Sequence, residues 1–230
     1  MNLIELFNQY GITLTNIQAD MFEKYFDFLI LENEKYNLTG ITEKDEVFVK
    51  HFLDSVLPVN LFENNTNVLD IGAGAGFPSI PLAILRPDIS FTLIDCVNKK
   101  INFLNQLVEL LNLNNVVAIH TRCEDFAKTN REKFDYVVAR AVAPMNTLLE
   151  YMTPLAKING RVVMYKGDNY LTELNECENV IKLFHVKHCK TIKYDLGECG
   201  KRNILIYQKL SQTPLKYPRN GNKPRLDPLL

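Results

Sequence analysis

Short apolar runs alternate with helical periods through most of this chain, and this alternation limits the fold more than any other feature of the sequence. Apolar runs occupy residues 67–71, 90–95, 116–120, 134–139 and 161–165. Helical periodicity marks 78–86, 97–112, a stretch near 145–157 and another near 168–181. Strands that alternate with helices in this way predict an α/β fold with a parallel sheet covered on both faces.

Two extended segments, 183–194 and 202–209, close this pattern. A short turn-rich loop joins them, so an antiparallel hairpin at the sheet edge is predicted. The sequence thus predicts a mostly parallel, seven-stranded sheet with a C-terminal antiparallel hairpin.

The N-terminal part differs in periodicity and charge from the rest. Ile17, Met21, Tyr25 and Phe28 recur at helical spacing behind a capping residue, Thr15, and predict two helices within residues 2–36. A further helix is predicted from Glu43 to about Leu57, where Pro58 stops it. We therefore expect a helical cap over residues 1–60 and a main domain over 61–210.

The last segment, 211–230, is Pro-rich and has no periodicity, so no helix or strand is predicted there. It carries four basic residues against one acidic residue, whereas residues 1–50 carry nine acidic and four basic residues. The net charge of −1 therefore hides opposite charges at the two ends, and it argues against an indiscriminate nucleic-acid coat protein.

Composition excludes several other classes. The chain has 230 residues with no long apolar run and no secretory pattern, so neither a membrane span nor export is expected. Its five cysteines are odd in number and scattered, which indicates reduced thiols in the cytoplasm. The spacing of these cysteines and the nearby histidines lacks paired ligands, so no metal site is expected.

A glycine-rich loop follows the first apolar run, with Gly72, Gly74 and Gly76 at alternate positions behind Asp70. A dinucleotide fingerprint would place its third glycine where this chain has Phe77, and the lysine of a phosphate-binding Walker loop is absent. The second run ends in Asp95, which is suited to a ribose diol. Together these features favour an adenosyl ligand without a pyrophosphate.

This arrangement resembles the class I S-adenosylmethionine-dependent methyltransferase fold. The resemblance implies that S-adenosylmethionine is the cofactor, with its carboxylate at the N–H groups of the loop and its ribose at Asp95. Cys123 and Glu124, after the third run, would then lie beside the adenine.

Two missing motifs narrow the methyl acceptor. The Asn/Asp-Pro-Pro-aromatic motif of many amine methyltransferases is absent after the fourth run, where the chain reads Ala139-Arg140-Ala141-Val142. None of the five cysteines follows Pro or Thr, as the nucleophile of a pyrimidine C5 methyltransferase usually does. Guanine N7, a hydroxyl or a small-molecule amine remain as acceptors.

A more specific resemblance rests on several motifs in order. They are Tyr36-Asn-Leu-Thr39, His51-Phe-Leu-Asp-Ser55, the segment from Asp70 to Leu82, Phe91-Thr-Leu-Ile-Asp95, Lys99-Lys-Ile-Asn-Phe-Leu104, Phe134 to Ala141, Lys166-Gly167 and Tyr217-Pro-Arg219. In this order the motifs resemble the bacterial 16S ribosomal RNA guanine-N7 methyltransferase family RsmG, also called GidB. The resemblance implies methyl transfer to a guanine of 16S rRNA, within the small ribosomal subunit. It also implies cofactor contacts at Gly72, Phe77, Cys123, Glu124 and Arg140, to which the loop analysis adds Gly74 and Asp95.

No catalytic residue is assigned, because guanine N7 needs no deprotonation and alignment of the reactants suffices. Arg140, at the end of the fourth run, is the candidate: it would bond a carboxylate or phosphate, or else pair with an acid such as Asp70. RNA contacts are predicted at Asn37, Lys166, Arg219, Lys223 and Arg225. His51 is expected only to make a hydrogen bond on a helix face.

Two other functions stay open at this point. One is an S-adenosylmethionine-dependent methyltransferase that acts on another RNA site or on a small molecule. The other is a nucleotide-sensing or scaffold protein that has lost catalysis, against which the intact glycines and Asp95 argue. For the main hypothesis we expect a monomer that binds 16S rRNA and neither membrane nor metal.

Overall fold

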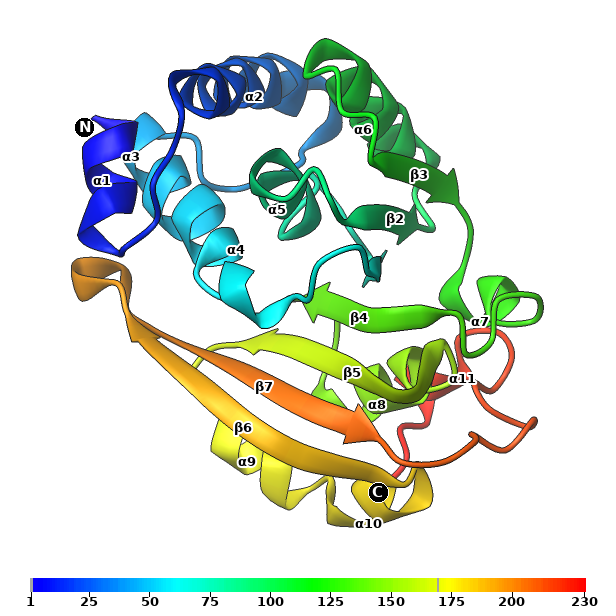
Figure 1. The fold of residues 1–230 in the computed structure, drawn as a ribbon. Helices are drawn as coiled ribbons and strands as arrows, with labels where there is room; N and C mark the ends of the chain where they lie inside the picture. Colours follow the sequence, from blue (N-terminus) through cyan, green and yellow to red (C-terminus); the bar gives the residue numbers. More distant parts are fainter. Residues whose placement is uncertain (1, 169) are drawn as a thin grey trace.

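The apolar runs of the sequence become the strands of one sheet in a computed structural model that describes residues 2–168 and 170–230 (Figure 1). The strands are β1 Asn67–Ile71, β2 Ser90–Asp95, β3 Val116–His120, β4 Phe134–Arg140, β5 Ala156–Lys166, β6 Val186–Asp195 and β7 Lys201–Lys209. Their order is β3-β2-β1-β4-β5-β7-β6. The strands from β3 to β5 are parallel, whereas β7 is antiparallel to both β5 and β6. The predicted fold class is confirmed.

Helices cover both faces of this sheet (Figure 1). One layer holds α1 Leu3–Gln9, α2 Asn16–Tyr36, α3 Lys44–Val47, the π-helix η1 Phe48–Leu53, α4 Asp54–Val56, α5 Ser79–Leu85 and α6 Asn98–Leu110. The other layer holds α8 Met145–Met152, α9 Tyr170–Asn175, α10 Glu178–Leu183 and α11 Lys223–Leu226, and the short α7 Cys123–Phe126 follows β3. Single 3-10 turns lie at η2 Val59–Leu61 and η3 Gly197–Cys199. Among the described residues, the search for a helix long and apolar enough to span a membrane finds none.

Local signals explain the helices of the N-terminal part. The Thr15 hydroxyl caps α2 by accepting a hydrogen bond from the Gln18 backbone N–H. The Gln18 side-chain oxygen in turn accepts one from the Thr15 backbone N–H. Asn37 ends the same helix in the left-handed conformation, with φ of 51°. The helix predicted from Glu43 to about Leu57 is also found, although its middle widens into the π-helix η1.

Three predictions on secondary structure need correction. The helix predicted over 145–157 ends at Met152, because Pro154 cannot continue it, and β5 begins at Ala156. The helix predicted near 168–181 forms two short helices, α9 and α10, and position 169 lies outside the described residues. No glycine or proline marks the break between them. The last segment holds one helical turn, α11.

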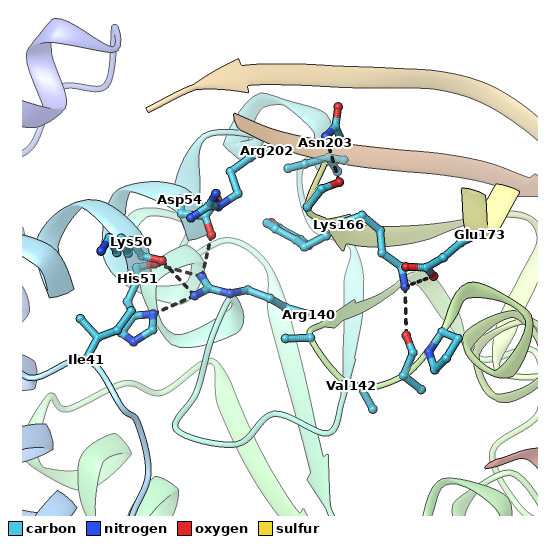
Figure 2. Close-up of a pocket in the computed structure, with 16 residues that line it drawn as sticks. Ile41, Lys50, His51, Asp54, Arg140, Val142, Lys166, Glu173, Arg202 and Asn203 are labelled. Atoms are coloured by element: carbon cyan, nitrogen blue, oxygen red, sulfur yellow. Dashed lines mark hydrogen bonds and ion pairs between the residues drawn. The ribbon is translucent and has the colours of Figure 1, made fainter. Parts of the chain in front are cut away.

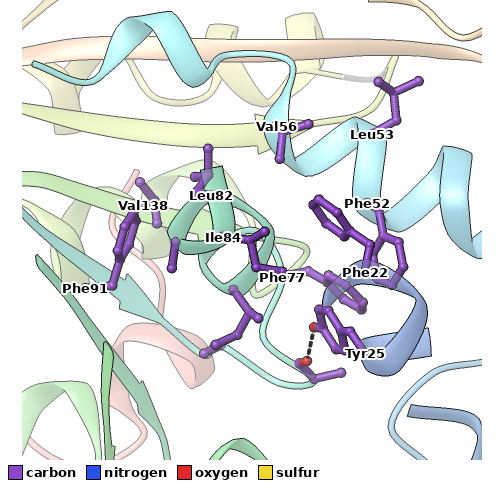
Figure 3. Close-up of a cluster of buried hydrophobic side chains, with 14 of the residues drawn as sticks. Phe22, Tyr25, Phe52, Leu53, Val56, Phe77, Leu82, Ile84, Phe91 and Val138 are labelled. Atoms are coloured by element: carbon purple, nitrogen blue, oxygen red, sulfur yellow. Dashed lines mark hydrogen bonds between the residues drawn. The ribbon is translucent and has the colours of Figure 1, made fainter. Parts of the chain in front are cut away.

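Aromatic side chains join the N-terminal helices to the glycine loop (Figure 3). Tyr25 of α2 lies 4.9 Å from Phe52 of η1 and 5.5 Å from Phe77, measured between ring centroids. The Tyr25 hydroxyl donates a hydrogen bond to the carbonyl oxygen of Ala75 at 2.5 Å. The helical layer and the sheet therefore share one apolar cluster, and the glycine loop packs against this cluster.

We expect Phe52→Ala to lower the free energy of unfolding by about 3–5 kcal/mol, because it removes a fully buried ring from this cluster. Urea unfolding measures the change. Ile17→Ala, at a side chain that is 75% exposed, is the control and should shift the same quantity by less than about 0.5 kcal/mol. A loss below about 1 kcal/mol for Phe52→Ala would contradict the role given to the cluster.

Candidate functional site

β1 and β4 are neighbours in the sheet, and the order in which the chain connects the strands reverses between them. The carboxyl ends of these two strands lie side by side at this point. Chain connections run from β1 through β2 to β3 on one side of this point and from β4 to β5 on the other. Open α/β sheets bind ligands at this switch point. Two cavities lie there, a smaller one of about 360 Å³ and a larger one of about 500 Å³. Ala141 and Val142, which follow β4, line both cavities, so the two spaces meet at the end of this strand.

The glycine loop needs its glycines for conformation and for space. Gly72 has φ of 69°, and a Cβ added there would lie 2.9 Å from a methyl group of Val142. Gly74 has φ of 59°, and a Cβ added there would meet nothing nearer than the Gly72 carbonyl oxygen at 3.8 Å. The loop thus packs closely on one side and leaves room for a ligand on the other.

Four of the predicted cofactor residues line the smaller cavity: Gly72, Asp95, Cys123 and Glu124. The Asp95 carboxylate accepts hydrogen bonds from the backbone N–H groups of Gly74 at 3.0 Å and Val97 at 2.9 Å. Gly74 therefore acts at this cavity through Asp95. The sequence predicted that the glycine loop lies close to residues at the ends of the second and third strands, and residues from all three places line this cavity.

Buried carboxylate oxygens at this edge have unused acceptor capacity among the described residues. Both carboxylate oxygens of Asp70 and Oε1 of Glu124 accept no hydrogen bond, although the two residues are 1% and 5% exposed. Oε1 of Glu124 has a long ion pair with Arg122, at 3.7 Å. Burial raises the pKa of Asp70 to about 7, and the nearby Ser79 opposes this rise only in part. Unsatisfied buried acceptors are costly, so a ligand that brings hydroxyl or ammonium donors fits this site.

Arg140 lies on the wall of the larger cavity and joins the sheet to the helical layer (Figure 2). Its guanidinium forms an ion pair with Asp54 at 3.1 Å and donates to the Ser55 hydroxyl at 3.1 Å. It also donates to the carbonyl oxygen of Lys50 at 2.9 Å and to Nδ1 of His51 at 2.8 Å. Its acidic partner is therefore Asp54, and the pairing with Asp70 offered as an alternative is not found.

His51 is held on three sides. Its Nδ1 accepts from Arg140, its Nε2 lies 2.8 Å from the Thr39 hydroxyl, and its ring stacks on Phe77 at 4.5 Å. Burial and the neighbouring Arg140 lower the pKa of His51 to about 3. The imidazole is therefore neutral near pH 7, as its role of acceptor from a guanidinium requires. His51 does more than the helix-face hydrogen bond expected from the sequence.

The remaining walls of the larger cavity carry paired charges. Lys166 contacts Glu173 at 2.6 Å and donates to the Ala143 carbonyl oxygen at 2.9 Å. Arg202 of β7 lies 3.5 Å from Asp54, whose pKa burial raises above its ordinary value. Charges held in pairs inside a cavity are fixed in position and can bind a polar ligand without reorganising.

Some of the other predicted site residues lie apart from the two cavities, and others make contacts that the sequence did not predict. Phe77 lines neither cavity and is 9% exposed in the aromatic cluster, while Asn37 and Lys223 are exposed. Arg219 binds Glu150 and Asp227, so its guanidinium has internal partners rather than a free face for RNA. Arg225 lines the smaller cavity.

Sequence reasoning missed several residues that line the cavities. Lys50 and Asp54 reach the larger cavity from the helical layer, Asn203 reaches it from β7, and Tyr151 and Asn222 line the smaller one. Asp54 lies within the motif His51–Ser55 and Lys50 directly precedes it, so this motif was their only signal in the sequence. Asn203 and Asn222 follow turn-rich stretches, and no sequence signal marked them as site residues.

The fold and the site define the class of an S-adenosylmethionine-dependent methyltransferase. The glycine loop and Asp95 fit the loop contacts and ribose hydroxyls of that cofactor, and the buried Glu124, whose Oε1 accepts no hydrogen bond, suits one of its donor groups. A solved structure of a SAM dependent methyltransferase from Aquifex aeolicus has the same fold, with a TM-score of 0.55 and 16% identity, over 73% of this chain and 94% of that one.

Closer relatives identify the family. Residues 18–204 match the GidB family, described as rRNA small subunit methyltransferase G. The chain is 46% identical to Ribosomal RNA small subunit methyltransferase G of Streptococcus gordonii, over 98% of this chain and 97% of the relative. It is 43% identical to the protein of the same name from Lactococcus lactis subsp. cremoris, over 96% and 94%. The chain belongs to the GidB family of rRNA small subunit methyltransferases, and its cofactor is S-adenosylmethionine.

The low pKa of His51 predicts a pH dependence of stability. Its pKa is about 3 in the folded protein against an ordinary value of 6.5, so unfolding takes up a proton between these values. The His51 contribution is complete above pH 6.5 and is lost as the pH falls, by about 1.4 kcal/mol at pH 5.5. Asp70 has the opposite sign, because its raised pKa makes the folded state hold the extra proton.

A comparison of the wild type with His51→Gln separates the two effects. Between pH 7.5 and 5.5, urea unfolding should show the wild type losing about 1.4 kcal/mol more than the variant. Parallel stability curves for the two proteins would mean that His51 titrates in the folded state as it does in the unfolded chain.

Gly74→Asp should weaken cofactor binding and cost some stability, because the backbone at this position is in the left-handed region, with φ of 59°. The added carboxylate would enter the open side of the loop, next to Asp95, where it takes the ligand's space and repels its carboxylate. We expect affinity for S-adenosylhomocysteine, measured by calorimetry, to fall at least about tenfold. Thermal unfolding is the control for folding, and undiminished binding by the folded variant would show that the loop lies outside the cofactor site.

Proposed function

We propose that this protein transfers the methyl group of S-adenosylmethionine to N7 of a guanine in 16S rRNA of the small ribosomal subunit. The observation that carries the proposal is the meeting of two cavities at Ala141 and Val142. The smaller cavity takes adenosine, because Gly72, Asp95 and Glu124 line it. The larger cavity has the volume for an extruded base, and it faces the same strand end.

Guanine N7 suits this site because it carries a free lone pair. An acceptor that must lose a proton would need a general base with a suitable pKa. His51, with a pKa of about 3, is a poor base near pH 7, and both of its nitrogens have partners. Asp54 and Glu173 are each paired with a cation. The described groups of the larger cavity therefore support an acceptor that attacks directly.

The residues of the chain act mainly by alignment. When bound, S-adenosylmethionine supplies an electrophilic methyl group on a sulfonium. Asp95 and the glycine loop hold the adenosine end, and Arg140, with four hydrogen bonds and one ion pair, sets the distance between the helical layer and the strand end. Good alignment is worth roughly 7–11 kcal/mol of the barrier. Methylation leaves a positive charge on the base, and the carboxylates of Asp54 and Glu173 lie on the wall that would face it.

Basic side chains around the larger cavity support an RNA partner. Lys50 and Arg202, whose side chains are 26% and 27% exposed, line this cavity. Lys166 lines it as well, and Asn37 and Lys223 are exposed, so all three stay predictions for RNA contact. Arg219 is assigned a structural role because of its internal partners.

We extend the proposal to the assembled small subunit as substrate and to a cytoplasmic monomer. A net charge of −1 gives little general attraction to phosphate, which favours recognition of a shaped ribosomal surface. Exposed large apolar side chains are scattered over different elements, as Ile17, Val117 and Leu171 illustrate, and such a distribution supports a monomer. The division into residues 1–60, 61–210 and 211–230 stays a prediction.

Labelled S-adenosylmethionine tests the reaction with three acceptors: naked 16S rRNA, small subunits from a strain that lacks this enzyme, and small amines or hydroxyl compounds. We expect label at N7 of one guanine, read by chemical cleavage at N7-methylguanine, with subunits preferred over naked RNA. Label at another atom, or transfer only to a small molecule, would refute the proposal.

A matched pair of variants ties the activity to the larger cavity. Arg202→Ala should lower kcat/KM for small subunits about tenfold, which corresponds to about 1.4 kcal/mol, and leave affinity for S-adenosylhomocysteine unchanged. Lys201→Ala removes the same charge from an exposed neighbour that lines neither cavity, and it should behave as the wild type. Equal effects of the two changes would point to general charge instead of the cavity.

A further inference from the structure

The C-terminal segment 211–230 forms part of the wall of the smaller cavity. Asn222 and Arg225 line this space together with Gly72, Asp95 and Glu124, which lie at or after the carboxyl ends of strands. Figure 1 shows the segment crossing from the end of β7 to the region of α7 and α8. A segment that the sequence assigns to RNA thus lies at the adenosine cavity.

Several contacts hold the segment in this position. Arg131 donates hydrogen bonds to the carbonyl oxygens of Thr213 at 2.7 Å and Tyr217 at 2.5 Å. The Thr147 hydroxyl of α8 donates to the Pro224 carbonyl oxygen at 2.9 Å. Thr213, Tyr217 and Pro224 are all buried. The segment is therefore packed on a separate apolar cluster that includes Tyr151, Phe184 and its own Tyr217, and it is not a free tail.

Arg219 is the main anchor of the loop that carries Asn222 and Arg225. Its guanidinium binds Glu150 of α8, a side chain that is fully buried, at 2.8 Å. It also forms an ion pair with Asp227 at 3.2 Å, which joins the two ends of the loop. A charge pair with one buried member is costly to break, so the loop keeps a fixed place over the cavity.

Arg225 is placed to contact a ligand in this cavity. Its side chain is exposed, and the one hydrogen bond found for it is a long one, 3.4 Å from Nη2 to the carbonyl oxygen of Val142, a residue of both cavities. Most donors of this guanidinium therefore have no described partner. A guanidinium next to a purine can stack on its ring or donate to its nitrogen atoms.

We propose that Asn222 and Arg225 belong to the cofactor site, where they bind the adenosine part of S-adenosylmethionine, and that Arg225 serves this purpose instead of RNA contact. Lys223, two residues earlier, is exposed and lines neither cavity, so it takes no part. The proposal rests on adenosine occupying the smaller cavity and is independent of which base is methylated.

Calorimetric titration with S-adenosylhomocysteine, on the full-length protein without RNA, tests this assignment. Arg225→Ala should raise Kd about tenfold, and Lys223→Ala, which removes the same charge nearby, should leave Kd within about twofold of the wild type. Wild-type affinity in Arg225→Ala would overturn the proposal. An equal loss in both variants would overturn it as well, because it would indicate a general effect of charge.

Hydrogen exchange on the unmodified protein gives a second, independent test. Saturating S-adenosylhomocysteine should slow amide exchange in residues 222–227 and in the glycine loop together. Protection of the loop without any change in 222–227 would exclude contact between this segment and the ligand. Neither measurement includes RNA or methyl transfer. A negative result here would therefore not contradict the proposed reaction, which the methyl-transfer assay tests separately.

Discussion

The bonding of Arg140 fixes the relative position of the sheet and the N-terminal helices. Its guanidinium projects from the end of β4 and meets Asp54 and backbone carbonyl oxygens of the π-helical run. A π-helix leaves carbonyl oxygens out of regular α-helical bonding, and such irregular turns often occur at functional sites. The larger cavity exists between these two parts, so its width depends on this side chain together with Tyr165 and Arg202, which also bond the helical layer. Both Ala141, with φ of 56°, and Val142 follow Arg140 directly, which extends the same constraint to the smaller cavity.

The charges around Arg140 are mutually dependent. Asp54 compensates the guanidinium, and neutral His51 accepts from it and stacks on Phe77 of the glycine loop. Each partner is buried or half-buried, so removal of one would leave another without compensation. This network runs without interruption from the helical layer to the glycine loop, where we propose that the cofactor binds. Alignment of two substrates demands such rigidity, because a small displacement of either reacting atom is costly.

Local sequence patterns predicted the order of strands and helices and several of their boundaries. The boundaries of β1 and β2 and the capping by Thr15 follow from residues within one turn or one strand, and the sequence states them directly. Gly72 and Asp95 were found because a loop and a strand end have recognisable composition. Contacts between distant parts were not predicted: Arg140 was expected to bond a carboxylate or phosphate, or else an acid such as Asp70, and the internal partners of Arg219 were missed. Such pairs leave no periodic signal, since nothing near Arg219 in the chain points to Glu150.

The order of the elements along the chain has a consequence for synthesis. The seven strands and the glycine loop are made before residues 211–230, which carry Asn222 and Arg225 of the smaller cavity. A polypeptide that stops before residue 211 keeps every strand and lacks one part of the lining of this cavity. If Asn222 and Arg225 bind the cofactor as we propose, such a truncated copy would compete little with the full-length protein for S-adenosylmethionine.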